Sequence, residues 1–135
     1  MIKIIAGQKG TGKTAKLVDD INQVAVEDNN VVCIERGNRL DQLLKCKVRL
    51  INIDEYPCTG YDQLLAFICG ICSKDYDISH IFIDSIKKVS KSTDMNELSA
   101  FLTELDKLAA ASSIAITIIL SEAIDTLPDS IKAFC

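Results

Sequence analysis

The chain has 135 residues, the size of one ordinary domain, and 48% of them are hydrophobic while 25% are charged. This composition excludes a disordered or fibrous protein. It predicts a core of mainly Ile, Leu, Val and Ala, because Trp is absent and aromatic residues make up only 5%. The net charge of −4 argues against a global basic face for nucleic acid, although it leaves a local basic patch open.

No stretch of the sequence is apolar for long enough to span a membrane. The longest apolar run, residues 114–120 with one Thr inside it, falls far short of the roughly 20 residues required. The N-terminal MIKIIAGQKG leads into a glycine-rich motif and lacks the features of a signal peptide. We therefore expect a cytoplasmic protein whose six cysteines are reduced thiols.

The first half of the chain alternates short β-branched runs with helical periods. Residues 2–6 are predicted to form a buried strand, and 13–27 a helix with Leu17, Ile21 and Val24 facing inward. Residues 28–30 have turn composition, and a second strand is expected at 31–35. A short helix at 39–45 and a third strand at 48–53 follow.

The second half continues the same alternation. A helix is predicted at 61–73 and a fourth strand at 78–84, and the following lysines, Lys87, Lys88 and Lys91, are expected in a solvated loop. The longest amphipathic helix is predicted at 94–111, where Asp94 and Glu97 form an N-cap pair. A fifth strand at 114–120 precedes a tail, 128–135, that is expected to add one or two helical turns.

Five nearly continuous apolar strands separated by helices indicate an α/β fold. Such strands are typical of a mainly parallel sheet buried on both faces, a three-layer α/β/α arrangement. The chain contains no linker, internal repeat or low-complexity segment, so residues 1–135 are predicted to form a single domain.

The residues after the first predicted strand fit the phosphate-binding pattern G-x-x-x-x-G-K-[ST] without a mismatch. Such a loop, opening a helix, directs backbone amides and the positive helix end at phosphate groups. Its lysine reaches the β- and γ-phosphates, and its hydroxyl residue holds Mg²⁺. The predicted nucleotide-binding residues are Gly7, Gln8, Lys9, Gly10, Thr11, Gly12, Lys13 and Thr14.

A phosphate loop of this kind needs an acid at the end of a neighbouring strand to organise the magnesium ion. Asp84, after the apolar Ile81-Phe82-Ile83, is the favoured Walker B residue. Asp54, after the third strand, is the alternative. We favour Asp84 because its strand is the more apolar and therefore the more central of the two.

These features resemble a RecA-like P-loop ATPase over nearly the whole chain, in the segments GQKGTGKT, VVCIERG, CTGYDQLL, HIFIDSI and ITIILSE. The resemblance implies the sheet order third, second, fourth, fifth, first strand. It also implies ATP as ligand, Mg²⁺ as cofactor, and Lys13, Thr14 and Asp84 as the phosphate- and metal-binding residues. We expect no DNA-binding or polymerisation regions of the recombinase type in these 135 residues.

The chain departs from that family at two catalytic positions. Gly37 stands where the family usually has its water-activating glutamate, which leaves Glu35 as the nearest acid, with Glu55 and Glu122 as alternatives. Ser121-Glu122 stands at the family's sensor position, where a carboxylate would repel the γ-phosphate unless a cation intervened. The absent glutamate predicts slow hydrolysis, and both departures favour a non-catalytic nucleotide-binding module.

Three functions are consistent with these observations. The first is a slow, Mg²⁺-dependent ATPase that acts as a switch or as a subunit of an oligomer or of a complex with a separate chain. The second is a small-molecule kinase or adenosyltransferase on the same loop, and the third is a non-catalytic nucleotide-gated interaction module. ATP is favoured over GTP because no N-K-x-D motif is present.

The remaining chemical signals have simpler interpretations. Cys69 and Cys72 form a C-x-x-C pair without the other ligands that a zinc site needs, so we expect them to be packing residues. His80, the only histidine, is expected to be structural. The three arginines, Arg36, Arg39 and Arg49, are expected on the surface, although one of them could stabilise a γ-phosphate.

Overall fold

The computed structural model describes residues 1–27, 30–45, 47–75 and 77–135. The turn expected at 28–30 therefore lies largely outside the described residues, as does Cys46, one of the six cysteines. None of the five described cysteines forms a disulfide. No helix among the described residues is long and apolar enough to cross a membrane.

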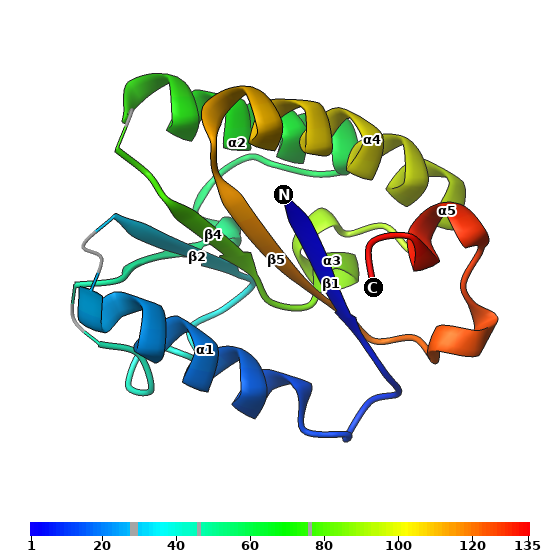
Figure 1. The fold of residues 1–135 in the computed structure, drawn as a ribbon, viewed down its shortest axis with the longest axis horizontal. Coiled ribbons are helices and arrows are strands. Elements are labelled where there is room, and N and C mark those ends of the chain that lie inside the picture. The colour runs from blue at the N-terminus through cyan, green and yellow to red at the C-terminus, as the bar shows by residue number, and fades with distance from the viewer. Residues whose placement is uncertain (28–29, 46, 76) are drawn as a thin grey trace.

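Five parallel strands form one sheet in the order β1-β5-β4-β2-β3. This order confirms the one that the family resemblance implied, with β5 between β1 and β4. All five strands run the same way, so their carboxyl ends share one edge (Figure 1). The strands are β1 (Ile2–Ala6), β2 (Val31–Glu35), β3 (Arg49–Asn52), β4 (His80–Ile83) and β5 (Ala115–Leu120).

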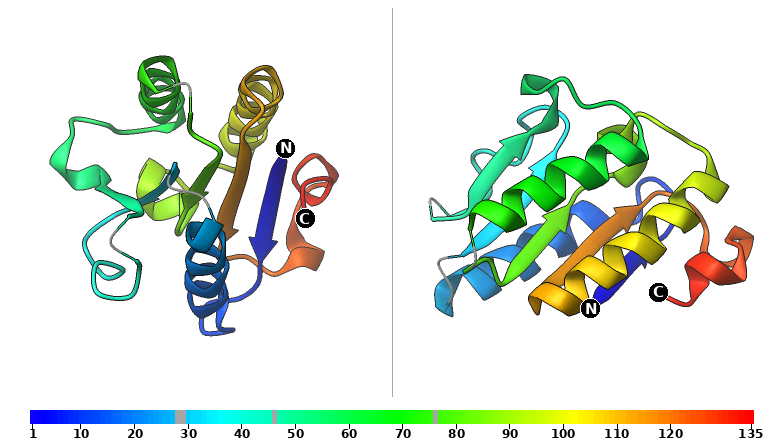
Figure 2. Two further views of the ribbon diagram at one scale, coloured as in Figure 1. Left: turned by 60° about the vertical axis from the view of Figure 1, so that its left-hand side comes forward. Right: turned by 90° about the horizontal axis from the view of Figure 1, so that it is seen from above.

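Helices cover both faces of the sheet, as Figures 1 and 2 show. The helices α2 and α4 lie side by side on one face, and α1 lies on the other (Figure 2). The chain therefore forms the predicted three layers. The α-helices are α1 (Lys13–Glu27), α2 (Tyr61–Lys74), α3 (Ile86–Ser90), α4 (Met95–Ser112) and α5 (Asp129–Lys132), and the 3-10 turns are η1 (Ile53–Glu55) and η2 (Ile124–Thr126).

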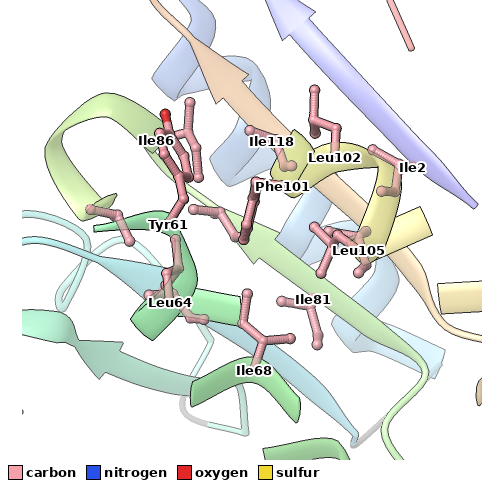
Figure 3. Close-up of a cluster of buried hydrophobic side chains, with 14 of the residues drawn as sticks. Ile2, Tyr61, Leu64, Ile68, Ile81, Ile86, Phe101, Leu102, Leu105 and Ile118 are labelled. Atoms are coloured by element: carbon pink, nitrogen blue, oxygen red, sulfur yellow. The ribbon is translucent and has the colours of Figure 1, made fainter. Parts of the chain in front are cut away.

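The larger part of the core lies between the sheet and the pair α2 and α4. Leu64 and Ile68 from α2 meet Leu102 and Leu105 from α4 above Ile81 of the sheet (Figure 3). On the opposite face, Leu17, Ile21 and Ala25 of α1 pack on the sheet, whereas Val24, which was predicted to face inward, is only partly buried. Successive side chains along each strand alternate between these two cores, and Cys33 and Phe82 belong to the core beside α1.

Two segments differ from the prediction. Residues 39–45 form successive turns rather than a short helix, and the buried Leu40 anchors them to the core under α1. The segment after Asp84 is the short helix α3 rather than a solvated loop. A helix of five residues has too few positions to show a helical period in the sequence.

A side-chain cap starts α4, and the C-terminal tail is bound to the edge of the sheet. Asp94 caps α4 as predicted, because its Oδ1 accepts hydrogen bonds from the N–H groups of Asn96 and Glu97. The carboxylate of Glu97 accepts from Ser92 instead of completing a reciprocal capping box. The tail that contains α5 lies beside β1, where the Phe134 carbonyl accepts from the Ile4 N–H at 2.8 Å.

The packing of α4 on the sheet leads to a prediction about stability. Leu102→Ala should lower the free energy of unfolding by about 2–5 kcal/mol, because the side chain is fully buried and its removal leaves a cavity. Asp106→Ala, on the exposed side of the same helix, should change it by less than about 0.5 kcal/mol. Urea denaturation measures both values, and equal effects would contradict the described orientation of α4.

Candidate functional site

The glycine-rich loop connects β1 to the first turn of α1, at the carboxyl edge of the sheet. The Gly7 N–H donates to the Leu120 carbonyl at 3.3 Å, which ties the start of the loop to the end of β5. Gly10 and Gly12 have φ angles of 86° and 82°, a region that side chains disfavour. The loop therefore has the strand–turn–helix arrangement that the motif requires.

Lys13, the first residue of α1, folds back over this loop. Its Nζ donates to the Gln8 carbonyl at 2.7 Å and lies 3.5 Å from Thr11 Oγ1. Only 9% of the residue is exposed. The ammonium group is thus held at the centre of the loop, where it can meet an anion bound by the loop amides.

Thr14 and Asp84 meet beside the loop, although 70 residues separate them in the chain. The Thr14 hydroxyl donates to Asp84 Oδ1 at 3.4 Å. The alternative acid, Asp54, lies elsewhere and pairs with Arg36 at 3.2 Å and with Lys91 at 3.6 Å. The structure therefore brings Asp84 rather than Asp54 next to the hydroxyl residue of the loop.

The Asp84 carboxylate is buried at the end of β4, with 1% of its side chain exposed. Arg39 Nη2 donates to Asp84 Oδ2 at 3.0 Å and supplies the countercharge that a buried carboxylate needs. The two carboxylate oxygens are thus divided: Oδ1 faces Thr14, and Oδ2 faces Arg39. The sequence singled out Arg39 only as one of three arginines.

Glu35 is buried at the end of the neighbouring strand β2. Its Oε2 accepts a hydrogen bond from the Leu40 N–H at 3.2 Å, and Oε1 has no partner among the described residues. Burial raises the pKa of this carboxyl, and the nearby Asp84 raises it further, against the lowering effect of the Leu40 N–H and of Arg39. Through the hydrogen bond from Leu40, the Glu35 carboxylate holds the turns that follow β2.

The backbone explains why no glutamate stands at position 37. Gly37 has a φ of 99°, a conformation that would strain any residue with a side chain. Its N–H donates to Asn52 Oδ1 at 2.9 Å and holds this turn against the end of β3. The position is used to turn the chain rather than to present a carboxylate.

A pocket of about 530 Å³ opens beside the glycine loop, a volume within the usual range for small-molecule sites. Thr14, Ser85 and Ser121 contribute hydroxyl groups to it, and none of the described lining residues carries a carboxylate. Glu35 and Glu55 are outside the lining. Cations reach the pocket from the loop, from α1, from the segment after β2 and from α3, namely Lys9, Lys13, Arg39, Lys87 and Lys88.

Helix α3 supplies two of these cations, which the sequence analysis had placed in a solvated loop. Ser85 adopts a left-handed conformation with a φ of 59°, which turns the chain sharply after Asp84 and starts α3. Lys87 Nζ then donates to Glu122 Oε1 at 2.6 Å. The Glu122 carboxylate therefore has a cation beside it.

The other candidate ligands do not gather into a site of their own. His80 shares a 2.8 Å hydrogen bond with Ser79, and Cys69 and Cys72 lie in α2. No group of three or more His, Cys, Asp or Glu side chains that could hold a metal ion occurs in the described parts of the chain. Thr14 and Asp84 would therefore provide two ligands at most, and a bound phosphate and water would have to supply the rest.

The arrangement of cations, hydroxyl groups and a single buried carboxylate at a helix N-terminus suits a phosphorylated ligand that carries a divalent cation. No protein-family model matches the chain, and a search of curated proteins finds no relative of it.

The burial of Glu35 leads to a prediction about pH dependence. Because its pKa is raised in the folded protein, the unfolded chain loses its proton first as the pH rises above the ordinary value of 4.5. The stabilisation that the raised pKa of Glu35 provides is therefore complete below pH 4.5. It decreases as the pH rises and is gone once the pH exceeds the pKa of Glu35 in the folded protein. Glu35→Gln does not titrate, so its melting temperature relative to the wild type should increase between about pH 4 and pH 7.

Thermal unfolding across this pH range measures the difference. The matched control is Glu27→Gln, which removes one carboxylate from the exposed end of α1. An equal trend in both variants would attribute the effect to net charge rather than to the buried position.

Proposed function

We propose that the chain is a P-loop nucleotide-binding domain that takes Mg²⁺ and ATP and hydrolyses the ATP slowly, as a switch or as one subunit of a larger assembly. The observation that carries the proposal is the contact between the Thr14 hydroxyl and Asp84 beside a pocket lined with cations. The chain has a net charge of −4, yet the described residues that line this pocket include five cations and no carboxylate, which favours a polyphosphate ligand.

Each part of the site has a role in this proposal. The loop amides and the N-terminus of α1 would receive the β-phosphate, and Lys13 would bridge to the γ-phosphate. Thr14 and Asp84 would hold the magnesium ion directly or through water, and the ion would neutralise charge on the phosphates. Lys87 and Lys88 approach the same pocket from α3.

Slow hydrolysis follows from the same geometry. A carboxylate that orients the attacking water must reach the γ-phosphate, and none of the described pocket residues carries one. The Glu35 carboxylate is buried and accepts from Leu40. We expect turnover on the order of 10⁻⁴ to 10⁻² per second, as in P-loop proteins that await an activating partner. A long-lived bound triphosphate suits a switch.

The first test is the affinity for Mg-ATP, measured by isothermal titration calorimetry. Lys13→Ala should weaken binding about 10- to 100-fold, because it removes a charge-assisted contact to the phosphates. Lys16→Ala removes the same charge from an exposed position on the same helix and should change affinity less than about threefold. Circular dichroism checks that both variants keep the fold.

The outcomes separate the candidate functions. Equal affinity of the wild type and Lys13→Ala would overturn the phosphate-loop assignment. Phosphate release by the wild type that is lost in Lys13→Ala would identify an ATPase. ADP formation only with an added acceptor would identify a transferase, and binding without turnover would identify a nucleotide-gated module.

A second test addresses the metal. Asp84→Asn should raise the Mg²⁺ concentration needed for half-maximal nucleotide binding about 10-fold, because the amide is a weaker ligand than the carboxylate. Asp54→Asn, at an acid that pairs with Arg36 instead, should leave it within about twofold. Titration of Mg²⁺ at fixed ATP measures both, and the reverse order would mean that β3 rather than β4 carries the metal-organising acid.

A further inference from the structure

Arg39 is the only arginine among the described residues that line the pocket. It lies in the turns after β2, and one of its nitrogens, Nη2, contacts the buried Asp84 at 3.0 Å. The Arg39 side chain is 57% exposed, and Nη2 is its only nitrogen with a hydrogen-bond partner among the described residues. A group with five N–H donors thus keeps several of them available for a ligand.

The contact with Asp84 leaves the proposed metal position accessible. Arg39 uses Oδ2, whereas the Thr14 hydroxyl points to Oδ1. A magnesium ion held by Thr14 and Oδ1 would therefore leave the contact of Arg39 with Oδ2 in place. Arg39 lines the same pocket as Lys13, the residue that would reach the γ-phosphate, so the guanidinium would border that group as well.

The turns that carry Arg39 are held on both sides of it. Before it, the Gly37 N–H donates to Asn52 at the end of β3. After it, the Leu40 N–H donates to Glu35 at the end of β2, and the Leu40 side chain is fully buried. This anchoring fixes where the guanidinium reaches the pocket, which lowers the entropy lost when it binds.

We propose that Arg39 bridges Asp84 and the γ-phosphate within the same chain and thereby makes the site select nucleoside triphosphates over diphosphates. The inference rests on the proposed function and deepens it. The fork of a guanidinium matches phosphate oxygens in two parallel hydrogen bonds, an arrangement that the ammonium of a lysine cannot reproduce. A diphosphate lacks the group that this fork would contact, so only the triphosphate gains from Arg39.

The test compares affinities for two probes, Mg-ADP and the magnesium complex of the non-hydrolysable β,γ-imido analogue of ATP, by calorimetry. Arg39→Ala should weaken binding of the triphosphate analogue about 10-fold or more and that of ADP less than about threefold. Arg36→Ala, which removes the same charge from a neighbouring position that pairs with Asp54 outside the pocket, should leave the ratio of the two affinities unchanged.

Arg39→Ala also removes the countercharge of a buried carboxylate and could unfold the protein. Arg39→Lys keeps that charge and loses the fork, so it should retain the melting temperature more closely and still reduce the preference for the triphosphate. Circular dichroism is recorded for each variant, and the affinity ratio is taken from those that fold.

The outcomes distinguish this inference from the proposed function. Equal losses for the two probes in Arg39→Ala and Arg39→Lys, or no loss in either variant, would overturn the role of Arg39. If Lys13→Ala still weakens binding of the probes in those cases, the proposed nucleotide site stands. Failure of the wild type to bind either probe would overturn both.

Discussion

A carboxylate that is buried at the end of a strand must find partners inside the protein, and the candidate site is built around that requirement at Asp84. Thr14 at the start of α1 donates to one oxygen, and Arg39 from the turns after β2 donates to the other. Three segments far apart in the chain therefore converge on one side chain. Their convergence at a single edge depends on the all-parallel sheet, in which β1, β5, β4 and β2 are consecutive and end at the same edge.

The charge distribution follows from the same edge. The chain is acidic overall, yet the described residues that line the pocket include five cations and no carboxylate. The acids of this region point to partners instead: Asp84 to Arg39, and Glu122 to Lys87. Each neutralised carboxylate holds a cation at the border of the pocket, so that the acids near the site help to position its positive charge.

Backbone geometry accounts for the glycine at position 37, where the family resemblance had led us to expect a glutamate. The turn at Gly37 needs a positive φ to direct the chain from β2 toward the buried Leu40, and a glutamate there would be strained. The acid two residues earlier, Glu35, accepts a hydrogen bond from the Leu40 N–H. Both residues therefore hold the segment that carries Arg39 in place.

Local patterns in the sequence predicted much of the architecture. The strand runs and the amphipathic periods located the five strands and the helices α1, α2 and α4 to within a few residues, because burial imposes a period on each element. The spacing of glycines and Lys13 located the loop, and the apolar character of β4 favoured Asp84 over Asp54. Asp94 was found as a helix cap, since capping depends on residues that are neighbours in the chain.

Only the tertiary structure decided which side chains meet. Arg39 lies 45 residues from Asp84 and Lys87 lies 35 from Glu122, distances at which no periodicity or local propensity carries information. These pairs depend on strand order, on the sharp turn at Ser85 that starts α3, and on turns at 39–45 that replace the expected short helix. The sequence by itself determined the fold class and the glycine loop, since both are written in neighbouring residues. The cationic lining of the pocket was decided by the packing that brings distant segments to one edge of the sheet.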